Sequence, residues 1–199
     1  MFRIKRWLRS DWGQMAILVM LLLAGRSSLA DHYFVPSGSM EFTLMPGDRV
    51  VVDKTAYGVR IPFTTIDLID MDTPHPGEIA VFDSPENDTL LIKRIVAVGG
   101  DRVDLVNGRL WLNGQRQAES ETATVEEFDH RMVRLNLDDG GGPDIRELVI
   151  PDGNVLVLGD HRGNSRDGRY FGLISERELY GRAVSVYYSR NEGFQWKRL

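Results

Sequence analysis

Two serines flank a glycine in the stretch Pro36-Ser-Gly-Ser-Met40, and this spacing suits nucleophilic chemistry. A hydroxyl attacks a carbonyl only when a nearby base takes its proton, and the oxyanion that forms needs hydrogen-bond donors already aimed at it. One serine can serve as the nucleophile while the other donates to the oxyanion, and the glycine lets a bound peptide approach the backbone closely. Serine and glycine are also common in turns, so an ordinary turn is the alternative interpretation.

The chain has no cysteine, so a base for this hydroxyl must come from histidine, lysine or a carboxylate. Among the four histidines only His161 lies in a polar cluster, but on extended backbone its neighbour Asp160 points away from it and cannot orient it. Lys93 is the stronger candidate, because on a strand it shares a face with aliphatic residues, and loss of hydration lowers the pKa of an amine. The alternative is that Lys93 extends from a sheet edge into water.

The segment 159–172 concentrates short polar side chains and alternating charges. Such a loop can hold its shape by pairing aspartate with arginine, and a hydroxyl in it can orient a buried amine. An ordinary charged loop is one alternative. A calcium loop is another, but Asp160, Asn164 and Asp167 lack the bidentate glutamate of the EF-hand pattern. Because no two histidines stand at ligand spacing, we expect neither a metal nor a cofactor.

The N-terminal segment combines basic residues with an apolar run that begins at Met15. Residues 13–35 are long enough to span a bilayer if Arg26 extends to the far interface. The preceding basic residues then place the N-terminus in the cytoplasm. We therefore expect a cytoplasmic basic segment at 1–12, a membrane anchor helix at 13–33 and an extracytoplasmic domain at 34–199. A cleaved signal peptide and a core helix are the alternatives.

From residue 49 onward the apolar pattern is that of strands. Strands are predicted at 49–54, 79–82, 90–98, 131–137, 147–150, 154–158 and 182–188, with a hairpin over 103–114 around Asn107-Gly108. We expect a loop or extended arm at 56–75, a solvated acidic excursion at 119–129, a flexible loop at 138–144 and a short helical turn near 175–179. The fold class is mostly β: a partly closed, barrel-like catalytic domain preceded by one N-terminal transmembrane helix.

The net charge of -5 argues against a nucleic-acid partner, since no basic footprint is present beyond the N-terminus.

In this order, the segments closely resemble bacterial type I signal peptidase, a membrane-bound Ser/Lys endopeptidase family. The resemblance runs from residue 26 to residue 172, with the nucleophile box at 36–40 and further boxes at Lys54 with Tyr57-Gly58, at 76–82, at Lys93-Arg94 with Gly100-Asp101, and at 159–172. The chain departs from the residues usual in that family at five positions: Phe42 (usually proline), Glu78, His161, Gly163 and Gly168.

The resemblance implies Ser39 as the nucleophile and Lys93 as the general base. It also implies that Ser37 donates to the oxyanion beside the Ser39 amide and that Ser165 hydrogen-bonds the lysine amine and positions it. The loop is expected to be supported by Asp160, Asp167 and Arg169. Shallow apolar pockets for the small residues of an Ala-X-Ala sequence are expected to be lined by Val35, Met40, Leu44 and Ile92.

The function that this resemblance implies is removal of N-terminal signal peptides from exported preproteins. The enzyme would cross the cytoplasmic (inner) membrane once, with its N-terminus inside, and would meet membrane lipid and the signal peptides of preproteins. One alternative is a specialised pilin- or conjugation-type maturation peptidase of the same family. A self-cleaving repressor would need DNA-binding helices, which have no counterpart here, and a non-catalytic membrane-tethered β-domain is a further alternative.

Overall fold

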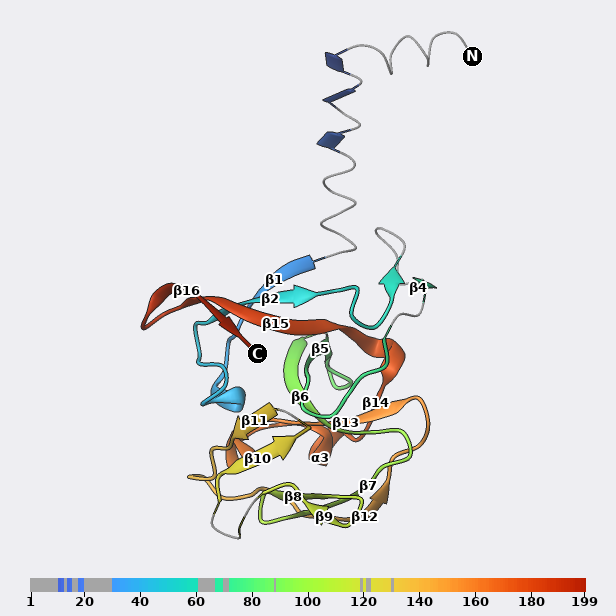
Figure 1. Ribbon diagram of the computed structural model, residues 1–199, viewed down its shortest axis with the longest axis vertical. Helices are drawn as coiled ribbons and strands as arrows, with labels where there is room; N and C mark the ends of the chain where they lie inside the picture. The colour runs from blue at the N-terminus through green and yellow to red at the C-terminus, as the bar shows by residue number, and fades with distance from the viewer. Residues whose placement is uncertain are drawn as a thin grey trace.

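The computed structural model contains one large antiparallel sheet, which is accompanied by smaller sheets of short strands (Figure 1). The structure describes residues 11–12, 14–15, 18–19, 30–60, 67–69, 72–87, 89–118, 120, 123–129 and 131–199. The eight-stranded sheet follows the order β1-β2-β15-β5-β6-β13-β14, and β16 pairs with β15. These strands are β1 (Ala30–Phe34), β2 (Arg49–Asp53), β5 (Ile79–Asp83), β6 (Leu90–Val98), β13 (Asn154–Leu158), β14 (Ile174–Ser175), β15 (Leu179–Ser189) and β16 (Gly193–Arg198).

Three smaller sheets accompany the large one. A four-stranded sheet has the order β12-β7-β8-β9, built from β7 (Arg102–Val106), β8 (Arg109–Leu112), β9 (Gln115–Arg116) and β12 (Ile145–Val149). Two hairpins are formed by β10 (Val125–Phe128) with β11 (Arg131–Arg134), and by β3 (Val59–Arg60) with β4 (Asp67–Ile69). From residue 30 onward, the helical elements that the structure describes are short. They are η1 (Gly38–Met40), η2 (Arg162–Asn164), α3 (Gly168–Phe171) and η3 (Glu176–Glu178).

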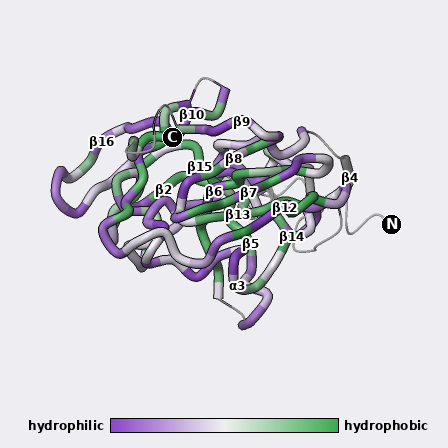
Figure 2. The backbone as a smooth tube through the Cα atoms, turned by 90° about the horizontal axis from the view of Figure 1, so that it is seen from below, coloured by the Kyte–Doolittle hydropathy of each residue, from purple (hydrophilic) through white to green (hydrophobic). Residues whose placement is uncertain are grey.

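β6 is the strand on which the core depends. It lies between β5 and β13 in the large sheet and contributes apolar residues to all three hydrophobic clusters of the core. In Figure 2 the apolar colour is concentrated along β6 and β13 and continues into β7. Its residues from Lys93 to Ala97 are all buried, because both faces of the strand are covered. A strand buried on both faces reads as a continuous apolar run, which is the pattern of this segment.

The hairpin expected at Asn107-Gly108 is confirmed. Asn107 and Gly108 have φ values of 50° and 75°, the left-handed conformation that both central residues of this two-residue turn require. The turn joins β7 to β8, with Val106 opposite Arg109. The strand predictions at 49–54, 79–82, 90–98 and 154–158 are also confirmed, as is the short helical turn near 175–179.

The acidic segment 119–129 was expected to be a solvated excursion, and for its second half this is wrong. Val125–Phe128 form β10, in which Glu126 and Phe128 are buried. Composition misleads here because one acid on the strand points inward to a buried arginine. The side chains of Glu126 and Arg162 both have 0% exposure, and Arg162 Nη2 lies 2.5 Å from Glu126 Oε2. The backbone N–H of Leu110 donates to the same carboxylate at 3.0 Å, which joins β8 to β10.

Most of the expected anchor at 13–33 lies outside the described residues. Its last four residues, 30–33, belong to β1, which pairs antiparallel with β2 and places His32 opposite Val51. Within the described ranges, no helix has both the length and the apolar character needed to cross a membrane. The expected arm at 56–75 is partly described and contains β3 and β4, while 61–66 and 70–71 lie outside the description. The large sheet ends at β1 and β14, which do not pair with each other in the described strands.

Removing the charge of Glu126 tests how much its buried ion pair with Arg162 stabilises the fold. Glu126→Gln leaves the guanidinium of Arg162 buried without a counter-charge, so we expect the free energy of unfolding to fall by about 3 kcal/mol. The measurement is urea unfolding followed by tryptophan fluorescence. Glu127→Gln is the matched control, because Glu127 is exposed on the same strand and its substitution should cost less than about 0.5 kcal/mol. Equal losses in the two variants would contradict a structural role for the pair.

Candidate active site

The structure brings Ser39 and Lys93 together. Ser39 lies in η1, which follows β1, and Lys93 lies in the middle of β6. The amine Nζ of Lys93 donates to Ser39 Oγ at a distance of 2.5 Å, although 54 positions separate the two residues in the chain. Ser39 is 7% exposed and Lys93 is 4% exposed. A hydroxyl and an amine are therefore held in contact in a site that is largely closed to water.

Burial lowers the pKa of Lys93 to about 8, because an ammonium group loses most of its hydration in this position. The carboxylates of Asp167 and Asp160 act in the opposite direction, and the guanidinium of Arg169 adds to the lowering. The amine can thus lose its proton close to neutral pH. That is the property that the strand pattern of the sequence predicted for this lysine.

Ser37 lies next to the nucleophile candidate. Its Oγ is 3.3 Å from Ser39 Oγ, and either hydroxyl could be the donor. Ser37 directly precedes η1 and has extended backbone. An O–H in this position is available to a negative oxygen that forms on a substrate carbonyl. Its role as an oxyanion donor stays a prediction.

Ser165 is buried against the same loop, and its Oγ has no hydrogen-bond partner in the described part of the chain. A Cβ added to Gly159 would come within 2.2 Å of Ser165 Oγ and 2.5 Å of the carbonyl oxygen of Ser39. Glycine at 159 therefore allows Ser165 and the nucleophile backbone to approach each other. The expected hydrogen bond from Ser165 to the amine of Lys93 is absent from this conformation, and its positioning role stays a prediction.

Asp160 is held by a buried arginine. Arg94 Nε and Nη2 donate to the two oxygens of Asp160 at 2.8 and 2.7 Å, and both side chains are almost fully buried. Thr43 Oγ1 donates to Asp160 Oδ2 at 2.5 Å, which connects the pair to the loop that follows η1. Sequence reasoning missed Arg94 as a site residue. The position of Arg94 next to Lys93 could have indicated this role. On a strand covered on both faces, a guanidinium is buried and requires a buried carboxylate as its partner.

Asp167 and Arg169 form an ion pair with side chains that are 0% exposed. Arg169 Nε donates to Asp167 Oδ1 at 2.8 Å, and the backbone N–H of Gly159 donates to Asp167 Oδ2 at 2.9 Å. Arg169 Nη2 also donates to the carbonyl oxygen of Arg162 at 2.6 Å. The two ends of the 159–172 segment are thereby fastened together beside Lys93.

All four residues expected to line a substrate pocket belong to one hydrophobic cluster, in which Val35, Met40 and Leu44 are buried and Ile92 packs against them. Val35 and Ile92 also line a cavity of about 70 Å³, together with Tyr33, Phe34, Pro36, Val81, Leu90 and Leu91. The role of the four residues in binding substrate stays a prediction.

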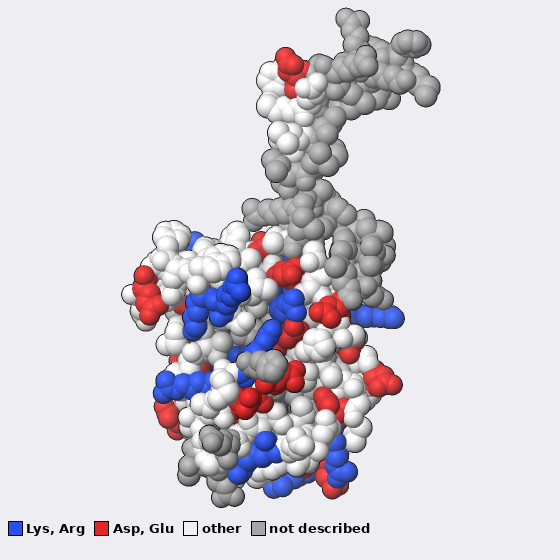
Figure 3. Space-filling model, in the orientation of Figure 1, with Lys and Arg blue, Asp and Glu red and all other residues white. Residues whose placement is uncertain are grey.

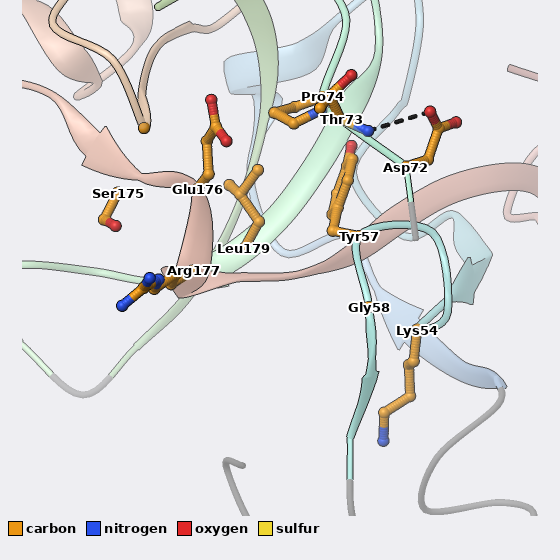
Figure 4. Close-up of a pocket in the computed structure, with 11 residues that line it drawn as sticks. Lys54, Tyr57, Gly58, Asp72, Thr73, Pro74, Ser175, Glu176, Arg177 and Leu179 are labelled. Carbon is orange, nitrogen blue, oxygen red and sulfur yellow. Dashed lines mark hydrogen bonds between the residues drawn. The ribbon is translucent and has the colours of Figure 1, made fainter. Parts of the chain in front are cut away.

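A separate cavity of about 320 Å³ contains none of the predicted catalytic residues (Figure 4). Tyr57 and Gly58 come from the segment after β2, and Glu176 and Leu179 come from the region where β15 begins. Burial raises the pKa of Tyr57 far above its ordinary value, and the nearby carboxylate of Glu78 raises it further. We assign no chemistry to this cavity, because it contains neither a nucleophile with a base nor a cluster of metal ligands.

The face shown in Figure 3 has acidic and basic side chains interspersed, without a continuous basic patch. In the ranges that the structure describes, no group of three or more histidines and carboxylates is arranged to hold a metal ion.

Comparison with known proteins gives one consistent family. A family model described as signal peptidase, peptidase S26, matches residues 5–188. A signal peptidase I of Pseudomonas aeruginosa is 31% identical over 86% of this chain and 69% of its own length, and a probable signal peptidase I-2 of Synechocystis is 30% identical over 85% and 68%. A crystal structure of a signal peptidase I from Enterococcus faecalis aligns with 57% of this chain and 98% of that chain, with a TM-score of 0.40 and 25% identity. The chain therefore belongs to the signal peptidase family, peptidase S26.

Proposed function

We propose that this chain is a serine endopeptidase that removes N-terminal signal peptides from exported preproteins, with Ser39 as the nucleophile and Lys93 as the general base. The observation that carries the assignment of residues is the 2.5 Å contact between a buried amine and a hydroxyl. Membership of the signal peptidase family supports the reaction and its substrate class.

The reaction begins when neutral Lys93 takes the proton of Ser39 Oγ, and the oxygen attacks the carbonyl carbon of the scissile bond. The backbone N–H of Ser39 and the hydroxyl of Ser37 donate to the oxyanion that forms. The ammonium of Lys93 then returns the proton to the leaving amine, so that the peptide bond breaks and an ester to Ser39 remains. In the second half, Lys93 takes a proton from water, hydroxide attacks the ester, and the proton goes back to Ser39 Oγ.

The charge state of Lys93 limits this reaction at neutral pH. With a pKa of about 8, roughly a tenth of the enzyme carries the neutral amine at pH 7. Arg94 on the same strand cannot replace it, because a guanidinium keeps its proton in proteins. The carboxylates of Asp160 and Asp167 are paired with Arg94 and Arg169 and hold the surrounding loops.

The cavity lined by Val35 and Ile92 supports a preference for small residues before the cut, as in Ala-X-Ala sequences. Its volume is about 70 Å³ and its lining is mostly apolar, which suits short apolar side chains.

We further propose that residues 1–12 lie in the cytoplasm, that 13–33 anchor the chain in the inner membrane, and that 34–199 form an extracytoplasmic domain with a partly closed, barrel-like sheet. The apolar run from Met15 and the basic residues before it support this topology. Phe34 is exposed at the end of β1, where an aromatic side chain can contact lipid headgroups. Anchoring raises the effective concentration of the enzyme for substrates that leave the same bilayer.

Substitution of the two reacting groups tests the mechanism. Ser39→Ala should lower kcat for a preprotein with an Ala-X-Ala site by about 10⁴-fold or more, because the attacking oxygen is gone. Lys93→Ala should lower it by about 100- to 10,000-fold, the usual contribution of a general base. Lys93→Arg is the matched control: it retains a long cationic side chain that cannot accept a proton, and it should be as inactive as Lys93→Ala. Substantial turnover by Lys93→Arg would exclude lysine as the base.

The pH dependence of kcat/KM tests the charge state. Because the neutral amine is the active form, kcat/KM should rise about tenfold per pH unit below pH 8 and level off above it. The measurement is a pH series with the purified full chain in detergent. A profile that levels off near pH 6.5 instead would indicate a histidine base.

Truncation tests the proposed topology. Deletion of residues 1–29 leaves β1 intact, so the shortened chain should cleave a preprotein in detergent at a rate within about tenfold of the full chain, since proximity rather than chemistry is lost. The same truncation should abolish co-sedimentation with phospholipid vesicles. Continued vesicle binding would show that the membrane contact lies in the β-rich domain.

A further inference from the structure

His161 is buried between two carboxylates that come from different loops. Its Nδ1 lies 3.0 Å from Glu41 Oε2, and its Nε2 lies 2.9 Å from Asp139 Oδ2. Neither ring nitrogen makes a well-directed hydrogen bond to these oxygens, although both oxygens lie within contact distance of the ring. A neutral imidazole has one N–H and can face only one carboxylate favourably, whereas an imidazolium is attracted to both. The arrangement therefore joins the two loops through one ring.

Glu41 belongs to the nucleophile loop, two positions after Ser39. Asn136 Nδ2 donates to the same Glu41 oxygen at 3.0 Å. A Cβ added to Gly38 would lie 2.5 Å from Glu41 Oε1, so the carboxylate lies against the backbone that precedes the nucleophile. The backbone N–H of His161 also donates to the carbonyl oxygen of Ser39 at 3.1 Å. His161 thus holds the nucleophile loop at two points, one through its backbone and one through its ring.

Asp139 belongs to the glycine-rich segment 138–142, which we name the strap. A Cβ added to Gly163 would come within 2.2 Å of the carbonyl oxygen of Asp139, so only glycine allows the strap to lie this close to η2. His161 and Gly163 are two of the positions at which the chain departs from the residues usual in signal peptidases. Both face the strap, and the two departures therefore have one structural explanation.

We propose that His161 is a positioning residue that acts through Glu41 to hold the nucleophile loop in the shape that aims Ser39 at Lys93. An unpaired carboxylate at Glu41 would place negative charge beside Gly38, next to the position where the oxyanion forms, and it would oppose that charge. The ring of His161 lies against this carboxylate and fixes its direction. This inference rests on the proposed Ser39–Lys93 mechanism and deepens it.

A double-mutant cycle of His161→Asn and Glu41→Ala tests the coupling in the full chain in detergent, with a preprotein bearing an Ala-X-Ala site. His161→Asn alone should lower kcat about tenfold and change KM by less than about twofold. In the Glu41→Ala background the same substitution should lower kcat by less than about threefold, because the contact between the ring and the loop is already gone. A purely structural role would give equal factors in both backgrounds, and that result, or an unchanged kcat in His161→Asn, would overturn the proposal.

A second pair of variants keeps the proposal testable if His161→Asn does not fold. The side chain of Glu41 is 30% exposed, so its substitution is compatible with folding. Glu41→Gln retains an oxygen that accepts from Asn136 and lies against the ring of His161, and it should keep kcat within about threefold, whereas Glu41→Ala removes this contact and should lower kcat about tenfold. Equal kcat values for these two variants would overturn the inference.

Two controls distinguish a failure of this inference from a failure of the proposed Ser39–Lys93 mechanism. His75→Asn alters an exposed histidine and should leave kcat unchanged. If Ser39→Ala remains active, the proposed function fails. If Ser39→Ala is inactive and His161→Asn is fully active, only the positioning role of His161 fails.

Discussion

The structure depends on keeping one amine out of water while it touches a hydroxyl. Lys93 loses hydration on β6, and this lowers its pKa to about 8. Two carboxylates close to it, Asp160 and Asp167, would restore the ammonium form if they were unpaired. Each is instead bound by its own arginine, Arg94 or Arg169, in a buried ion pair. Because each carboxylate is neutralised by its arginine, burial is the main factor that sets the pKa of the amine.

The same ion pairs hold the backbone that surrounds the amine. Arg94 and Thr43 meet at Asp160, which ties β6 and the loop after η1 to the end of β13. Arg162 and Glu126 tie the middle of the 159–172 segment to β10. Breaking a buried pair costs much more than an exposed one, since the remaining charge has no water to solvate it. The charged residues of the 159–172 segment are thus structural as well as electrostatic, and this explains why so many occur in so short a stretch.

The sequence predicted the local features of this site better than its long-range contacts. The apolar strand around Lys93 and the Ser-Gly-Ser spacing predicted a buried amine and a two-hydroxyl loop, because both depend on short-range pattern and backbone freedom. The pairing of Glu126 with Arg162 was not predictable in this way, since an acid-rich segment has the composition of a solvated loop until its partner is known. Met40 and Leu44 are fully buried in the same cluster as Val35, and their expected place in the substrate pocket stays a prediction. Apolar residues beside a catalytic loop can face either the core or a substrate pocket, and composition does not distinguish the two.

The nucleophile loop itself carries a conformational cost that the surrounding contacts offset. Phe42 has φ 74°, a left-handed conformation that costs a non-glycine residue about 1 kcal/mol. Proline, which is usual at this position in signal peptidases, is fixed near φ −65° and could not adopt this left-handed conformation. The guanidinium of Arg134 lies 4.2 Å from the centre of the Phe42 ring, a cation–π contact that contributes about 0.5 to 1 kcal/mol. His161 contacts Glu41, and Asp160 accepts a hydrogen bond from Thr43. Together with Phe42, three consecutive side chains therefore hold this turn. Its shape is determined by contacts with β11, the start of η2 and the end of β13 rather than by a proline in the loop.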